Sequence, residues 1–87
     1  MQAETTGLDG NAIAGLLWDV FGAEMTTATG ECANCRRSGP VAETVVYLRA
    51  PGIVVRCRNC LAILAVFVTV RDATCVDLRG LARLERA

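Results

Sequence analysis

Two pairs of cysteines constrain the fold of this chain more than any other feature of its sequence. The pairs are Cys32-Ala33-Asn34-Cys35 and Cys57-Arg58-Asn59-Cys60, and 21 residues separate them. A Cys-x-x-Cys turn places two thiolates close enough to bind one metal ion, and two such turns complete a tetrahedral site of four sulfur ligands. We therefore predict one structural Zn²⁺ per chain. Its expected ligands are Cys32, Cys35, Cys57 and Cys60.

Other uses of four cysteines fit this sequence less well. Two disulfides would need an oxidising compartment, and the chain shows no export signal. A thioredoxin-like redox motif needs a Cys-x-x-Cys that opens a helix, whereas both pairs lie between predicted strands. Four cysteines also bind iron, as in rubredoxins, or an iron–sulfur cluster. Rubredoxins are acidic with an aromatic core, whereas only 5% of these residues are aromatic. Zinc is therefore favoured, with iron as the alternative.

The size and composition predict one small domain. A chain of 87 residues buries only about 60% of its unfolded surface, so a metal or a partner often supplements its core. Apolar residues make up 53% of the chain and charged residues 21%, which excludes a disordered tail. The longest apolar run, Leu61–Val70, is shorter than the roughly 20 residues of a membrane span. We expect a cytoplasmic protein without a membrane segment.

An amphipathic helix is predicted after a polar leader of residues 1–8. Asp9 can cap the helix, and Gly22 suits the left-handed residue that ends one. Between them, apolar residues recur at helical spacing on one face: Ile13, Leu16, Leu17, Val20 and Phe21. Trp18 flanks this stripe and is expected at the edge of the core. The predicted helix covers residues 9–22.

Antiparallel strands are predicted over most of the remaining chain. Thr26, Thr27 and Thr29 favour a short strand before the first cysteine pair. Two hairpins should follow: residues 41–49 with 53–56, turning at Ala50-Pro51-Gly52, and residues 62–70 with 74–78, turning at Arg71-Asp72-Ala73. The spacing of Leu78, Leu81 and Leu84 indicates a helical turn or a coiled edge.

These elements predict an α+β fold in which the N-terminal amphipathic helix packs on a small antiparallel zinc-ribbon sheet of four or five strands. We expect a single domain over residues 1–87, with the zinc ribbon at 25–78 and a C-terminal tail at 79–87.

Charge is divided along the chain. Residues 1–31 hold five acidic residues and no basic one, whereas residues 32–87 hold nine arginines and four acidic residues. Five arginines lie on or near the cysteine turns: Arg36, Arg37, Arg49, Arg56 and Arg58. They could bind phosphate, which makes nucleic-acid binding an alternative function, or they could offset the negative charge of a zinc–thiolate centre.

Nothing in the sequence suggests catalysis or a small-molecule substrate. The chain has no histidine, and its single serine is Ser38. Four cysteine ligands would leave no open position on the metal for water. We therefore predict that the protein is not an enzyme. The fifth cysteine, Cys75, is expected to be a small buried residue of a strand.

Both faces of the strand within Leu61–Val70 are apolar. Strict alternation places Leu61, Ile63, Ala65 and Phe67 on one face and Ala62, Leu64, Val66, Val68 and Val70 on the other. One short helix can cover only one face of such a sheet. The second face needs the C-terminal tail, a second copy of the chain or another protein, and we favour a subunit or partner.

Several segments together carry a family resemblance. They are Leu8-Asp9-Gly10-Asn11, Phe21-Gly22-Ala23-Glu24-Met25-Thr26, the two cysteine turns, Ala50-Pro51-Gly52 and Asp77-Leu78-Arg79-Gly80. Over residues 8 to about 84 the chain resembles an uncharacterised family of short actinobacterial zinc-ribbon-like proteins, a domain of unknown function. The resemblance implies an accessory role beside a flavin- or molybdopterin-dependent redox enzyme. Typical zinc ribbons place glycine directly after each Cys-x-x-Cys, where this chain has Arg36 and Leu61, and Gly39 is expected to serve the first turn.

The sequence thus predicts a non-catalytic zinc protein that acts as a protein-interaction or accessory subunit, with a homo-oligomer or another protein as its partner. A nucleic-acid-binding zinc ribbon that uses the arginine-rich hairpin is the first alternative. A rubredoxin-like iron electron carrier is the second.

Overall fold

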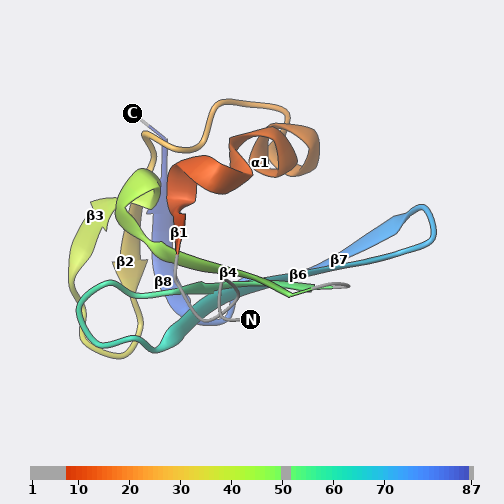
Figure 1. The fold of residues 1–87 in the computed structure, drawn as a ribbon. Helices are drawn as coiled ribbons and strands as arrows, with labels where there is room; N and C mark the ends of the chain where they lie inside the picture. The colour runs from red at the N-terminus through yellow and green to blue at the C-terminus, as the bar shows by residue number, and fades with distance from the viewer. Residues whose placement is uncertain (1–7, 50–51, 87) are drawn as a thin grey trace.

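Two antiparallel sheets and one short helix make up the part of the chain that the computed structural model describes, residues 8–49 and 52–86 (Figure 1). The large sheet has the order β1-β4-β5-β6-β7 and the small sheet the order β3-β2-β8. The strands are β1 (Leu8–Asp9), β2 (Thr29–Cys32), β3 (Ser38–Pro40), β4 (Val45–Arg49), β5 (Gly52–Arg56), β6 (Ile63–Val70), β7 (Ala73–Asp77) and β8 (Leu81–Glu85). The predicted leader falls outside the described residues, except for Leu8 in β1.

The N-terminal helix forms where the sequence predicts it. A 3₁₀ turn, η2 (Gly10–Ile13), leads into α1 (Ala14–Phe21). The Asp9 carboxylate accepts a hydrogen bond from the backbone N–H of Asn11 at 3.1 Å, and Gly22 ends the helix with φ of 69°. No helix in the described part of the chain has the length and apolarity to span a membrane.

The apolar stripe of the helix packs against the large sheet, as expected. Ile13 and Leu17 are buried, and Leu16, Val20 and Phe21 pack around them at the core's edge. The expectation for Trp18 is wrong, since this residue is 56% exposed. Successive helical residues turn by about 100°, so the residue after Leu17 points away from the sheet that Leu17 faces.

The two predicted hairpins form, with shifted boundaries. β4 pairs with β5 and β6 pairs with β7, both antiparallel. The first predicted strand starts late, because Thr26 and Thr27 lie in a turn and β2 begins at Thr29. The segment Val41–Glu43 is a 3₁₀ turn, η3, rather than the start of a strand. The backbone N–H groups of Val41 and Ala42 donate to the carbonyls of Ala28 and Thr26, so neither N–H takes part in a sheet.

The C-terminal tail is a strand, which corrects the expectation of a helical turn or a coiled edge. β8 pairs with β2, and the register places Leu81 opposite Cys32 and Leu84 opposite Gly30. A bulge accommodates one extra residue of β8 between these pairs. The bulge lets leucines three positions apart point to the same face, so a spacing that resembles a helix belongs to an irregular strand.

A second bulge, in β6, changes which residues of that strand face the core. Val55 pairs with Ala65 but Arg56 pairs with Ile63, which leaves Leu64 as the extra residue. Leu64 and Ala65 are therefore buried side by side, whereas Ile63 is 45% exposed on the opposite face. The strict alternation predicted for this strand is thus wrong at Ile63 and Leu64.

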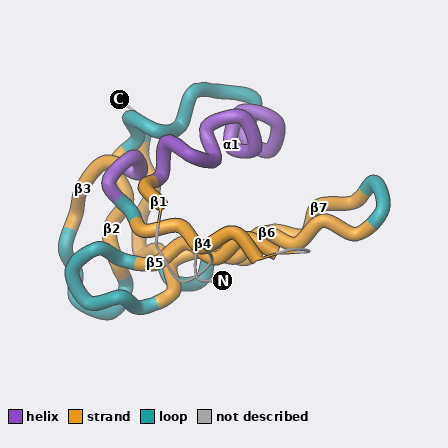
Figure 2. The backbone as a smooth tube through the Cα atoms, in the orientation of Figure 1, coloured by secondary structure: helices purple, strands orange, loops and turns teal. Residues whose placement is uncertain are grey.

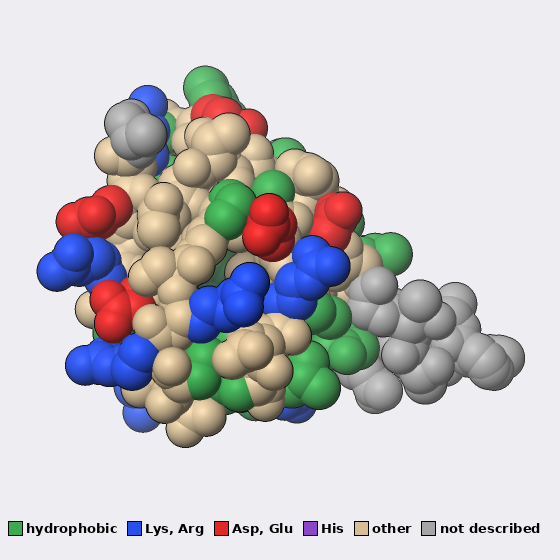
Figure 3. Space-filling model, turned by 90° about the vertical axis from the view of Figure 1, so that its left-hand side faces the viewer, with side chains coloured by type: hydrophobic (Ala, Val, Ile, Leu, Met, Phe, Trp, Pro, Cys, Tyr) green, Lys and Arg blue, Asp and Glu red, His purple; other side chains and the backbone are tan. Residues whose placement is uncertain are grey.

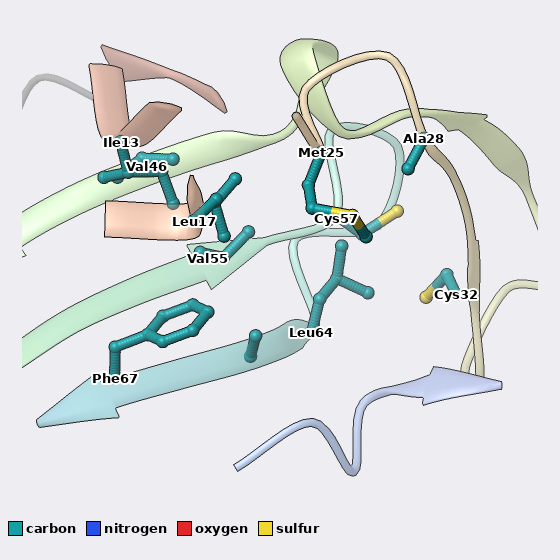
Figure 4. Close-up of a cluster of buried hydrophobic side chains, with 11 residues drawn as sticks. Ile13, Leu17, Met25, Ala28, Cys32, Val46, Val55, Cys57, Leu64 and Phe67 are labelled. Atoms are coloured by element: carbon teal, nitrogen blue, oxygen red, sulfur yellow. The ribbon is translucent and has the colours of Figure 1, made fainter. Parts of the chain in front are cut away.

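The buried core lies between the helix and the two sheets (Figure 4). Its members are Ile13, Leu17, Met25, Ala28, Cys32, Val46, Val55, Cys57, Leu64, Ala65 and Phe67. Leu81 and Leu84 of β8 pack against this core, as does Leu78 just before that strand, so the small sheet closes one side of the core. A cavity of about 50 Å³ is left within it, far smaller than the roughly 300–1,000 Å³ of typical ligand pockets.

The opposite face of the large sheet, called the outer face below, does not join this core. It presents Arg56 and a set of apolar or aromatic side chains, namely Val45, Tyr47, Val54, Ile63, Val66, Val68 and Val70. Among the described residues these side chains are half-buried or exposed, and none belongs to the core or packs against it. The tube view shows α1 above the sheet and the β6–β7 hairpin extending beyond the rest of the molecule (Figure 2). The described part of the C-terminal tail pairs with β2 through β8 and so belongs to the small sheet.

Candidate metal centre

Each cysteine pair forms a tight turn between two antiparallel strands. The first knuckle, residues 32–37, connects β2 to β3 in the small sheet, and the second knuckle, residues 57–62, connects β5 to β6 in the large sheet. In the first, the backbone N–H of Cys32 donates to the Arg37 carbonyl at 3.0 Å, and that of Arg36 donates to the Cys32 carbonyl at 2.9 Å.

The second knuckle repeats the hydrogen bonds of the first. The N–H of Cys57 donates to the Ala62 carbonyl at 2.9 Å, and that of Leu61 donates to the Cys57 carbonyl at 2.8 Å. The two turns therefore have the same local geometry, although their sequences share only the two cysteines and the asparagine before the second cysteine.

The residue directly after each Cys-x-x-Cys adopts a left-handed conformation. Arg36 has φ of 67° and Leu61 has φ of 64°. At these two positions a zinc ribbon would carry glycine, and both residues adopt the backbone conformation that glycine favours. The expectation that Gly39 serves the first turn is wrong, because Gly39 lies in β3 opposite Gly30.

This left-handed backbone leads to a testable prediction at Leu61, whose side chain is half exposed. The left-handed conformation costs a residue with a Cβ atom about 1–2 kcal/mol, and glycine avoids that cost. We expect Leu61→Gly to be more stable than Leu61→Ala by about 1 kcal/mol, because both remove the side chain but only glycine relieves the strain. Urea unfolding of the two metal-loaded variants measures the difference. Equal midpoints, or a more stable alanine variant, would contradict the strained turn.

The four cysteines meet at one point between the two knuckles. All four Sγ atoms lie within 4.8 Å of one another. The Cys32 and Cys60 sulfurs are 3.7 Å apart, as are the Cys35 and Cys57 sulfurs. A tetrahedral ion with metal–sulfur bonds of about 2.3 Å has sulfur–sulfur edges of about 3.8 Å. A disulfide bond is about 2.05 Å long, and all four thiols are free. The residues thus fit a four-sulfur metal site, and sequence spacing predicted all four of them.

Asparagine side chains tie each knuckle to the other. The Asn34 amide donates to the Cys60 sulfur at 3.4 Å, and the Asn59 side chain hydrogen-bonds to Cys35. Sequence reasoning missed this role. The signal was present, because an asparagine precedes the second cysteine of both pairs.

These hydrogen bonds favour the thiolate form at the second cysteine of each pair. The Asn59 side chain, helped by a backbone N–H, lowers the pKa of Cys35 to about 6. The Asn34 side chain likewise lowers the pKa of Cys60. Burial acts the other way at Cys57 and raises the pKa of its thiol. Metals bind the thiolate, so the crossed asparagines prepare two of the four ligands.

Gly80 joins the first knuckle to the large sheet, a role that sequence reasoning also missed. Its N–H donates to the Leu64 carbonyl at 3.1 Å, and its carbonyl accepts from the N–H of Ala33 at 2.9 Å. A Cβ atom at this position would overlap the backbone of Ile63 and Leu64. Only glycine allows this close approach.

The arginines near the knuckles are partly engaged within the chain. Arg36 lies 3.4 Å from Glu31, and Arg56 donates to the Leu61 carbonyl at 2.8 Å while lying over the Tyr47 ring. Arg37 and Arg58 are exposed, and the side chain of Arg49 lies outside the described part. Arginine and acidic side chains adjoin one another on the knuckle end of the molecule (Figure 3). This end is not a surface of one charge sign.

The fifth cysteine lies apart from the cluster. Cys75 is in strand β7, as predicted, but it is exposed rather than buried. Among the described strands, β7 is the last of the large sheet and pairs with β6 on one side.

Comparison with known proteins supports the expected membership of an uncharacterised family. A search of curated proteins and a search of solved structures found no match to the chain. The profile of a family of unknown function, DUF6510, matches residues 2–87. Because that match spans nearly the whole sequence and both cysteine pairs, the protein belongs to the DUF6510 family.

Proposed function

We propose that this protein is a non-catalytic interaction or accessory subunit of the zinc-ribbon type, stabilised by one structural Zn²⁺. The observation that carries the proposal is the meeting of four cysteine sulfurs between knuckles of two different sheets. A Zn²⁺ with four sulfur ligands has no open position for water or substrate, which favours a structural role over a catalytic one. Metal binding at this point would join the small sheet to the large one, so binding and folding are linked.

The interaction role is supported by the outer face of the large sheet. Its apolar side chains lie outside the core, and Ile63 and Val70 are 45% and 55% exposed. A run of apolar side chains across several strands is typical of a surface that another protein covers. An accessory role beside a redox enzyme is consistent with this surface, although that idea comes from the family resemblance alone.

Metal content and the absorption spectrum of natively purified protein test the proposal together. We expect one zinc per chain and no absorption in the visible range, because Zn²⁺ has a filled d shell. Iron with thiolate charge-transfer bands would overturn the proposal in favour of an electron carrier. Co-purifying nucleic acid, visible as excess absorption in the near ultraviolet, would favour the nucleic-acid alternative. A folded protein with four free thiols and no metal would remove the basis of the proposal.

A further inference from the structure

One sheet edge in the described structure lacks the features that normally prevent strand pairing. β1 has two residues, β3 has three and ends at Pro40, and β8 carries Arg83 and Glu85. Short edges, proline and charged side chains all discourage pairing with another chain. β7 has five residues, no proline and a single charge, at its last residue, Asp77. Its first four residues are exposed.

The pairing of β7 with β6 determines which backbone groups face outward. Residues 71 and 72 form the turn, and Val70 pairs with Ala73 beside it. The pair that flanks a two-residue hairpin turn is hydrogen-bonded, and hydrogen-bonded pairs then alternate along an antiparallel ladder. Ala73 and Cys75 therefore direct their backbone groups toward β6. Thr74 and Val76 direct theirs to the open edge.

A second copy of β7 can satisfy these outward groups in one symmetric register. Antiparallel pairing centred on Cys75 places Thr74 of each copy opposite Val76 of the other. All outward N–H and C=O groups of both residues then find partners. A register centred one residue earlier would pair Thr74 with Thr74 of the other copy and Val76 with a residue of its turn. A register centred one residue later would pair Val76 with Val76 of the other copy and Thr74 with a residue beyond the end of the strand. The centred register also sets the two Cys75 residues face to face, with Cα atoms about 4.5 Å apart.

Charge at the strand ends agrees with this register. Asp77 of one copy comes opposite Ala73 of the other, which is two residues from Arg71 in the hairpin turn. Diagonal neighbours across an antiparallel pair are about 7–8 Å apart, within reach of an arginine side chain. Asp77 also accepts hydrogen bonds from its own Arg79, the shortest at 2.7 Å, and these favour the ionised carboxylate.

We propose that two copies of this chain pair antiparallel through β7, with Cys75 on the two-fold axis. The two large sheets then form one continuous sheet, and their outer faces lie on the same side of it. The proposal goes beyond the proposed function, because pairing through β7 uses a strand edge and leaves both outer faces open to another partner. It does not depend on which metal the cysteines bind.

Light scattering during size-exclusion chromatography of the full metal-loaded chain tests the proposal. We expect the wild-type mass to rise from monomer to dimer with increasing concentration. Val76→Lys places a charge on the pairing edge and should weaken the dimer by roughly tenfold or more. Val70→Lys is the matched control, because Val70 is 55% exposed but lies on β6, one strand away from the edge. It should dimerise as the wild type does.

Oxidation with diamide tests the register. Two facing Cys75 thiols would release two protons and two electrons to diamide and form one disulfide bond. Non-reducing electrophoresis should show this cross-linked dimer in the wild type, much less of it in Val76→Lys and none in Cys75→Ser.

Metal content measured on each sample separates the two proposals. A zinc-loaded wild type that stays monomeric at every concentration would overturn the β7 dimer and leave the zinc proposal standing. The same conclusion would follow if Val76→Lys dimerised as well as Val70→Lys. A folded dimer that binds no metal would overturn the zinc proposal and leave the dimer.

Discussion

Cys57→Ala is expected to lose its metal and to unfold. Cys57 is 5% exposed and belongs to both the core and the sulfur cluster. Structural zinc sites contribute about 10–16 kcal/mol of binding free energy, whereas small domains have a total unfolding free energy of about 5–15 kcal/mol. If removing one ligand abolishes metal binding, the lost binding free energy is as large as the whole unfolding free energy of a small domain. Far-ultraviolet circular dichroism should show loss of the strand signal, and metal analysis should show less than one equivalent of zinc.

Cys75→Ala provides the control for this experiment. It makes the same chemical change at an exposed cysteine outside the cluster. We expect full metal content and an unchanged spectrum. A strong chelator should convert the wild type to the state of Cys57→Ala, and added Zn²⁺ should reverse the change. Cooperative unfolding of Cys57→Ala at the wild-type midpoint would show that the fold does not need the metal.

Gly80→Ala is expected to destabilise the protein by about 3 kcal/mol or more. The added Cβ atom would overlap the backbone of Ile63 and Leu64, which cannot rotate away as a flexible side chain can. Relieving the overlap means breaking the hydrogen bonds that Gly80 makes to Leu64 and to Ala33 of the first knuckle. Urea unfolding of the metal-loaded protein measures the loss.

Gly15→Ala is the matched control, with an effect of opposite sign. Gly15 lies in α1, and a Cβ atom there would meet nothing within 4 Å. Alanine in a helix interior is more favourable than glycine by about 0.5–1 kcal/mol. We therefore expect a small gain in stability at Gly15 and a large loss at Gly80. Similar effects at the two positions would mean that Gly80 does not make the close approach described above.

The sequence predicts the four-cysteine cluster better than the sheets. The cluster follows from spacing alone, because a Cys-x-x-Cys turn is a local structure. The helix is equally local: Asp9 caps the 3₁₀ turn that leads into α1, and Gly22 ends α1 as predicted. The contacts of Asn34 and Asn59 with the opposite knuckle, and the hydrogen bonds of Gly80 to Leu64 and Ala33, depend on how distant segments approach each other. A single sequence does not contain that information in readable form.

Bulges explain the errors in strand assignment. One extra residue reverses the alternation of inward and outward side chains from that point onward. In β6 this happens at Leu64, and in β8 it makes Leu81 and Leu84 resemble one face of a helix. Leu64 therefore belongs to the core and not to the face that strict alternation assigns to it together with Val66 and Val68. The exposed positions of Trp18 and Cys75 were missed for a related reason, since the sequence shows that a residue is apolar but not whether anything covers it.

The place of the sulfur cluster along the chain has a further consequence for folding. The last of the four cysteines is residue 60, whereas β8, which completes the small sheet, spans Leu81–Glu85. Before β8 pairs, β3 is the one described neighbour of β2 within the small sheet. The pairing of β2 with β8 spans about fifty residues of chain, and contacts of such long sequence separation form slowly. The two knuckles are closer in sequence, so a metal added during refolding could join them while the small sheet is still incomplete. Under the zinc proposal, metal present at that stage would influence how much of the protein reaches its final strand order.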